Sequence, residues 1–129
     1  MGDITVEYSG SFPMRVRIGE HEVLMDVPPS LGGTATTPSP TDYLIAGIAA
    51  CKVAYAAAFA QRRGLNVSGI TGTAEVGKGD SCVETIHVKL HVDGDLPADM
   101  KSGMERMVGS CYVGKSVKRP TELTFEIEC

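Results

Sequence analysis

The stretch SPTDYLIAGIAACKVAYAAAFAQRRG, residues 39–64, decides the fold because it predicts one long helix with clear ends. Ser39 suits the N-cap, Pro40 suits the first helical position, and Asp42 completes a capping-box-like pair with Ser39. Gly64 is a natural residue just past the end of a helix, where a left-handed backbone is common. We therefore expect the helix to run between these two ends.

The body of this helix, residues 43–60, contains a single charged residue, Lys52. It is short for a membrane span, rich in alanine and interrupted by that lysine, so we expect no membrane insertion. A helix that is apolar on nearly all sides must be buried on nearly all sides. Because a small sheet covers only one face, the pattern predicts a homodimer with this helix near the interface.

Alternating apolar and polar residues predict antiparallel strands on both sides of the helix. The predicted strands are residues 4–8, 14–18 and 23–27 before it, and 70–76, 86–92 and 123–127 after it. A second helix is predicted from Pro97, with an apolar stripe of Met100, Met104, Met107, Val108 and Cys111. The expected fold is α+β in the order βββ-α-ββ-α-β, with one domain over residues 1–129.

Composition narrows the classes of function. The chain has 129 residues, of which 43% are hydrophobic and 22% charged, as in ordinary globular domains. Its net charge of −4 and pI near 5.3 argue against nucleic-acid binding. The first ten residues lack the pattern of a secretory leader, so we expect a cytoplasmic protein.

Histidine pairs and cysteines are the remaining candidates for chemistry. On a strand, His87 and His91 would lie about 13 Å apart and could not hold one ion together, so no metal and no cofactor are expected.

The four cysteines form no CxxC motif. Cys51 lies in the predicted central helix and Cys111 on the stripe of the second. Taken singly, each could be a buried small hydrophobe. Cys82 and Cys129 are expected to be incidental.

The stretch GGTATTPSPTDYLIAGIAAC, residues 32–51, followed by CYVGKSV, residues 111–117, resembles the OsmC/Ohr family. This family comprises osmotically inducible protein C and the organic hydroperoxide resistance proteins. The resemblance implies an intertwined homodimer with sheets around central helices. It also implies a thiol-dependent peroxidase that reduces organic hydroperoxides and is recycled by a dithiol such as dihydrolipoamide.

By the same resemblance, Cys51 would be the peroxidatic cysteine and Cys111 the resolving one. The candidates for stabilising the Cys51 thiolate are Arg15, Arg17 and Asp42, with Lys52 and Lys115 as weaker cations. The sequence departs from the family pattern at Thr41, where the hydroperoxide-resistance branch carries a glutamate that orients its arginine. It departs again at Tyr112, where the family commonly has proline.

Two other interpretations stay open. The chain could be a non-enzymatic dimer that binds an apolar small molecule, with the cysteines merely structural, or a purely structural dimer. A peroxidase would need the two sulfurs close enough to form a disulfide and a cation beside Cys51.

Overall fold

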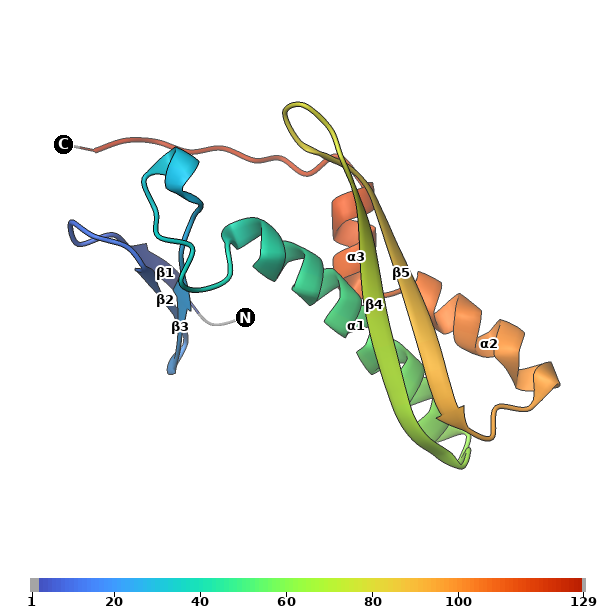
Figure 1. The fold of residues 1–129 in the computed structure, drawn as a ribbon. Helices are drawn as coiled ribbons and strands as arrows, with labels where there is room; N and C mark the ends of the chain where they lie inside the picture. Colours follow the sequence, from blue (N-terminus) through green and yellow to red (C-terminus); the bar gives the residue numbers. More distant parts are fainter. Residues whose placement is uncertain (1–2, 129) are drawn as a thin grey trace. The chain divides into compact units, whose positions relative to one another are not determined.

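The computed structural model describes residues 3–128 and has mixed α+β architecture with antiparallel sheets (Figure 1). The chain forms two compact units, one up to Ile45 and one from Ala46 onward. The division falls inside the long helix, so each unit holds a part of it. The expected α+β fold is confirmed, with the differences described below.

The first unit contains a three-stranded antiparallel sheet of β1 (Ile4–Glu7), β2 (Met14–Ile18) and β3 (His21–Met25) in chain order. The tight turn at Gly19, a residue with φ of +59°, joins the second and third strands. The third strand begins and ends two residues earlier than predicted. A short 3-10 helix, η1 (Pro29–Leu31), follows in the loop.

Helix α1 runs from Pro40 to Arg62, as its end signals predict. The Ser39 hydroxyl accepts a hydrogen bond from the Asp42 backbone N–H at 3.2 Å, and the Asp42 carboxylate accepts one from the Ser39 N–H at 2.9 Å. This reciprocal pair is a capping box. At the other end Gly64 has φ of +63°, which ends the helix in a left-handed residue.

The length and apolar composition of α1 would suffice to cross a membrane, although the central helices of water-soluble folds share both properties. Only 22% of its most apolar 18-residue window is buried within the chain. The residues that are fully covered are Ile48, Ala56, Phe59 and Ala60. Much of this apolar helix is therefore uncovered in a single chain.

The second unit is built on a long hairpin of β4 (Val67–Lys78) and β5 (Val83–Gly94). The turn closes with a hydrogen bond of 2.8 Å from the Gly79 N–H to the Cys82 carbonyl. Apolar residues alternate with exposed polar ones along both strands, so one face of the hairpin is exposed to solvent, as predicted. The dry face packs on α1 around a core of Ala56, Phe59, Ala60 and Met104.

Two helices follow the hairpin, where only one was predicted. Helix α2 (Ala98–Gly109) places its methionine stripe against the core, as expected. Helix α3 (Tyr112–Lys118) lies in a segment for which no helix or strand was predicted. The predicted last strand, 123–127, is wrong for this single chain: residues 120–128 pair with no described strand. The apolar residues of this segment are exposed: Leu123 by 90%, Phe125 by 89% and Ile127 by 81%. No surface of the described chain covers them.

Candidate functional site

Cys51 and Cys111 both belong to the second unit. Cys51 lies on α1 and is half-buried, whereas Cys111 connects α2 to α3 and is fully buried. Both are free thiols, as is the exposed Cys82 in the hairpin turn. Cys129 lies outside the described residues. No hydrogen bond to the Cys51 sulfur occurs within residues 3–128, so the two candidate cysteines have different surroundings.

A lysine joins the two elements that carry these cysteines. The Nζ of Lys52, the neighbour of Cys51, lies 3.6 Å from the Sγ of Cys111. It also donates a hydrogen bond of 3.4 Å to the Val108 carbonyl at the end of α2. This contact ties Cys111 to the side chain of the residue that follows Cys51 on α1.

Gly114 allows α3 to approach this contact closely. A Cβ atom at this buried position would lie 2.7 Å from the Cys111 Sγ and 3.4 Å from the Lys52 Nζ. Real side chains do not approach a sulfur so closely, so any larger residue would force the sulfur or the helix to move. Glycine here keeps α3, Cys111 and Lys52 packed together.

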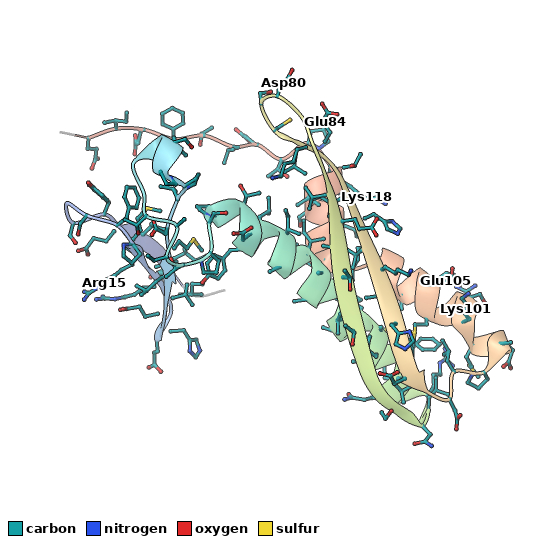
Figure 2. All side chains as sticks on the ribbon, viewed as in Figure 1. Arg15, Asp80, Glu84, Lys101, Glu105 and Lys118 are labelled. Carbon is teal, nitrogen blue, oxygen red and sulfur yellow. The ribbon has the colours of Figure 1, made fainter. Side chains whose placement is uncertain are left out.

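An open cavity of about 650 Å³ lies between β5, α2 and the end of α3. Its apolar lining includes Val88, Leu90, Met104 and Val108, and Lys52 lines it as well. Three further charged lining residues are labelled in Figure 2: Lys101 and Glu105 on α2, and Lys118 at the end of α3. Neither cysteine lines this cavity, so Lys52 links it to the sulfur of Cys111.

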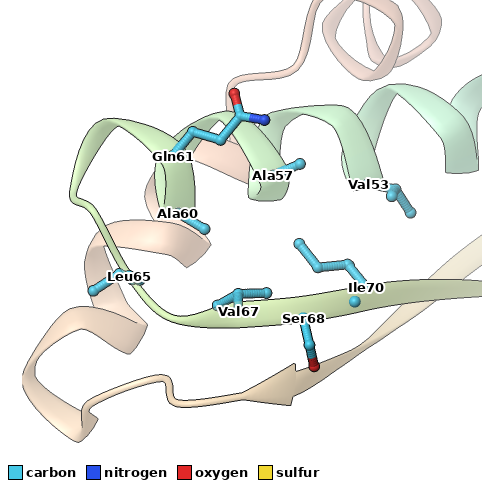
Figure 3. Close-up of a pocket in the computed structure, with 9 residues that line it drawn as sticks. Val53, Ala57, Ala60, Gln61, Leu65, Val67, Ser68 and Ile70 are labelled. Atoms are coloured by element: carbon cyan, nitrogen blue, oxygen red, sulfur yellow. The ribbon is translucent and has the colours of Figure 1, made fainter.

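A smaller hollow of about 280 Å³ separates the second half of α1 from the start of β4 (Figure 3). Small or apolar residues line most of it, among them Val53, Ala57, Val67 and Ile70. Gln61 and Ser68 are its polar side chains. It lies on a part of α1 that does not carry the cysteines.

The other predicted site residues belong to the first unit. Arg15 and Arg17 are exposed on β2, and the Arg15 Nε lies 3.9 Å from a carboxylate oxygen of Glu22. Asp42 contributes to the capping box of α1. The proposed action of these three residues on Cys51 stays a prediction.

The histidines considered as metal ligands lie on the exposed face of β5, where His91 contacts the Asp93 carboxylate at 3.0 Å. No cluster of three or more possible ligands occurs in residues 3–128.

Asp26 is a buried carboxylate that the sequence pattern does not reveal. It is fully buried and accepts hydrogen bonds from the backbone N–H groups of Val27, Thr34 and Thr36 and from both threonine hydroxyls. The Thr34 hydroxyl above all, followed by the backbone donors, holds the pKa of Asp26 well below its usual range despite burial. Asp26 thus fixes the loop that leads into α1.

Comparison with known sequences decides the family. The sequence model of the OsmC-like proteins matches residues 33–126, which include the capping box, both candidate cysteines and the hairpin. The chain belongs to the OsmC-like protein family. No curated protein matches this OsmC-like chain closely enough to count as a relative.

Solved structures agree with this OsmC-like fold. A Psychrobacter arcticus protein, provisionally named as an osmotic stress induced and detoxification response protein, has 22% identity and a TM-score of 0.78 over 90% of this chain and 88% of its own. An OsmC-like protein from Mycoplasma pneumoniae has 16% identity and a TM-score of 0.76, covering 92% and 87%.

A third structure is an organic hydroperoxide resistance protein OsmC from Legionella pneumophila. It has 17% identity and a TM-score of 0.65, covering 92% of this chain and 89% of its own. At these identities the likeness establishes the fold. It leaves the reaction of this OsmC-like chain to be argued from its own residues.

Proposed function

We propose that this OsmC-like protein is a thiol-dependent peroxidase that reduces organic hydroperoxides and contributes to oxidative-stress defence. The observation that carries the proposal is the contact between Lys52 and Cys111. Through this contact the side chain next to Cys51 in the sequence binds the sulfur of Cys111, and both cysteines belong to one compact unit, which supports a joint role. Family membership and the name of the Legionella relative support the same reaction.

In the first step, the Cys51 thiolate attacks the terminal oxygen of the hydroperoxide. A sulfur–oxygen bond forms, the oxygen–oxygen bond breaks, and the alkoxide takes a proton and leaves as an alcohol. Cys51 is then a sulfenic acid, oxidised by two electrons. We propose that Arg15 or Arg17 supplies the positive charge that stabilises the starting thiolate, with Asp42 orienting it.

In the second step, Cys111 attacks the sulfenic sulfur of Cys51. A disulfide forms, the sulfur–oxygen bond breaks, and hydroxide leaves and becomes water by taking a proton. An external dithiol, of the dihydrolipoamide type, then reduces the disulfide and becomes a cyclic disulfide itself. The cycle restores both thiols and needs no bound cofactor.

We further propose that the working form is a homodimer. The weak burial of α1 within one chain supports this, as does the uncovered apolar row of Leu123, Phe125 and Ile127. Exposed apolar surfaces of this extent generally mark an interface. A second copy of the chain is the partner that satisfies both elements at once.

A peroxidase assay with cumene hydroperoxide and a dithiol tests the reaction. We expect Cys51→Ser to abolish turnover, and Cys111→Ser to form a sulfenic acid at Cys51 but to recycle poorly. Cys82→Ser is the matched control because Cys82 is exposed in the hairpin turn, and it should retain wild-type turnover. Unchanged turnover in the Cys51 variant would refute the proposal.

The second candidate function is non-enzymatic binding of an apolar small molecule, with structural cysteines. The open cavity of about 650 Å³ beside β5 and α2 favours it, because its size and apolar lining suit such a ligand. Under this alternative, binding of a fluorescent fatty-acid probe would be saturable while both cysteine-to-serine variants showed no change in hydroperoxide consumption.

A further inference from the structure

Lys52 is the one charged residue in residues 43–60 of α1. Its half-buried position favours a polar or negatively charged neighbour. Its ammonium group is half-buried and is satisfied by the Val108 carbonyl and the Cys111 sulfur. Within residues 3–128, no carboxylate lies within 4 Å of it. A buried cation is costly unless an opposite charge or several dipoles accompany it. Of the two groups that the ammonium contacts in the described part of the chain, the sulfur of Cys111 is the one that can carry a negative charge.

The packing around this pair is close. Cys111 is fully buried, whereas Lys52 is half-buried and lines the open cavity, so water screens the attraction between the sulfur and the ammonium group from one side only. Gly114 brings α3 against both groups, and its missing Cβ leaves the space that the sulfur occupies. The pair is therefore built into three helices, α1, α2 and α3, rather than formed by two side chains on a surface.

We propose that Lys52 is the positioning residue for Cys111: its ammonium group orients the sulfur and stabilises the negative charge on that sulfur as it attacks the sulfenic acid of Cys51. This inference rests on the proposed function and assigns Lys52 to the second step of that reaction. Lys52, which contacts Cys111, serves the resolving cysteine. Another positively charged residue stabilises the Cys51 thiolate for its attack on the peroxide.

The step itself balances without any further reactant. The Cys111 thiolate donates an electron pair to the sulfenic sulfur of Cys51, the disulfide bond forms, and hydroxide departs with the electrons of the sulfur–oxygen bond. A proton from solvent converts the hydroxide to water. Lys52 lines the open cavity between β5 and α2, which provides solvent on one side of the ammonium group.

The experiment separates the two chemical steps in full-length protein treated with one equivalent of cumene hydroperoxide. Trapping with dimedone reports the sulfenic acid at Cys51, and non-reducing mass spectrometry reports the disulfide. In Lys52→Met we expect the Cys51 thiol to be oxidised at nearly the wild-type rate, with more of the sulfenic acid trapped by dimedone. Disulfide formation should slow by at least about tenfold, because a free thiol is only a few per cent ionised at neutral pH.

Two further variants isolate charge from packing. Lys52→Arg keeps the charge and should restore disulfide formation to within about threefold of wild type. Lys89→Met removes a charge from the exposed face of β5 and should change neither step. If Lys52→Met does not fold, Lys52→Gln takes its place, since it keeps a hydrogen-bond donor without the charge, and the same slowing is expected.

Disulfide formation at the wild-type rate in Lys52→Met or Lys52→Gln would overturn the inference, as would an equal slowing in Lys89→Met. These outcomes leave the peroxidase proposal intact if Cys51 still forms a sulfenic acid. Conversely, a wild-type protein in which Cys51 is oxidised neither to a sulfenic acid nor to a disulfide would refute the proposed function itself, whatever the behaviour of Lys52.

Discussion

Asp26 in the first unit and Cys111 in the second are both fully buried, yet their surroundings differ in kind. Five donors surround the Asp26 carboxylate, so both of its oxygens are satisfied. The Cys111 sulfur has one ammonium group beside it and a glycine against it. A buried group that is fully hydrogen-bonded serves structure, whereas one with a single mobile cation remains able to react.

Asp26→Ala should produce the largest effect on stability, because five donors lose their acceptor in one substitution. Buried donors without partners are costly, so we expect the melting temperature to fall by roughly 10 °C. Circular dichroism on heating measures the change. The matched variant Asp93→Ala removes an exposed carboxylate and should shift the melting temperature little. An equal loss in both would contradict the structural role given to Asp26.

Lowering the pH should also reduce the stability of the protein, by a smaller amount, because it protonates Asp26. The pKa of Asp26 is lowered in the folded protein, so its contribution to stability is full above the ordinary carboxyl pKa near 3.8. That contribution is lost as pH falls below about 4 toward the folded pKa, because the unfolded chain then binds the proton first. Melting curves between pH 7 and 2 should therefore show a steeper acid loss for wild type than for Asp26→Asn.

Gly33→Ala tests how closely the loop encloses Asp26. A Cβ at Gly33 would overlap the Val27 carbonyl oxygen and approach the Asp26 carboxylate to 2.6 Å. Backbone atoms cannot yield cheaply, so we expect a loss of about 2 kcal/mol in the free energy of unfolding. Urea denaturation measures it. Gly47→Ala is the control because nothing lies within 4 Å of its Cβ position; a loss as large there would remove the argument.

Gly114→Ala should have the smallest effect on stability and a selective effect on chemistry. Its Cβ meets the Cys111 sulfur and the end of the Lys52 side chain, and the lysine can swing away, so we expect about 1 kcal/mol. Displacing Cys111 from Lys52 should slow disulfide formation about threefold while sulfenic acid formation at Cys51 continues. Quenched-flow mixing with hydroperoxide, followed by mass spectrometry of the cysteines, measures the rates of sulfenic acid formation and of disulfide formation separately.

The sequence predicted the elements whose signals are local. The caps of α1 and the alternation of the hairpin depend on residues a few positions apart, and both were confirmed. Helix α3 was missed because it is short and contains two β-branched valines and Gly114, which disfavour a helix in isolation. The alternation at 123–127 correctly marks strand-like residues, but a strand also needs a neighbour, which no pattern within the segment supplies.

The contacts that distinguish the site are not local. The partners of Asp26 include donors eight and ten residues further along, and Cys111 lies 59 positions from Lys52. The one signal available was the lone charge in an apolar helix, since a buried lysine must find a partner. The identity of that partner depends on the packing of α3 against α1, and α3 was not predicted from the sequence.

The most direct measurement of the central claim is the covalent state of the cysteines after one equivalent of organic hydroperoxide. Tryptic peptides of the quenched protein, separated without reducing agent, identify which sulfurs are joined. We predict a disulfide between Cys51 and Cys111, with Cys82 still alkylated as a free thiol. Oxidation that spares Cys51, or a Cys51 that is oxidised while Cys111 remains a free thiol, would contradict the account.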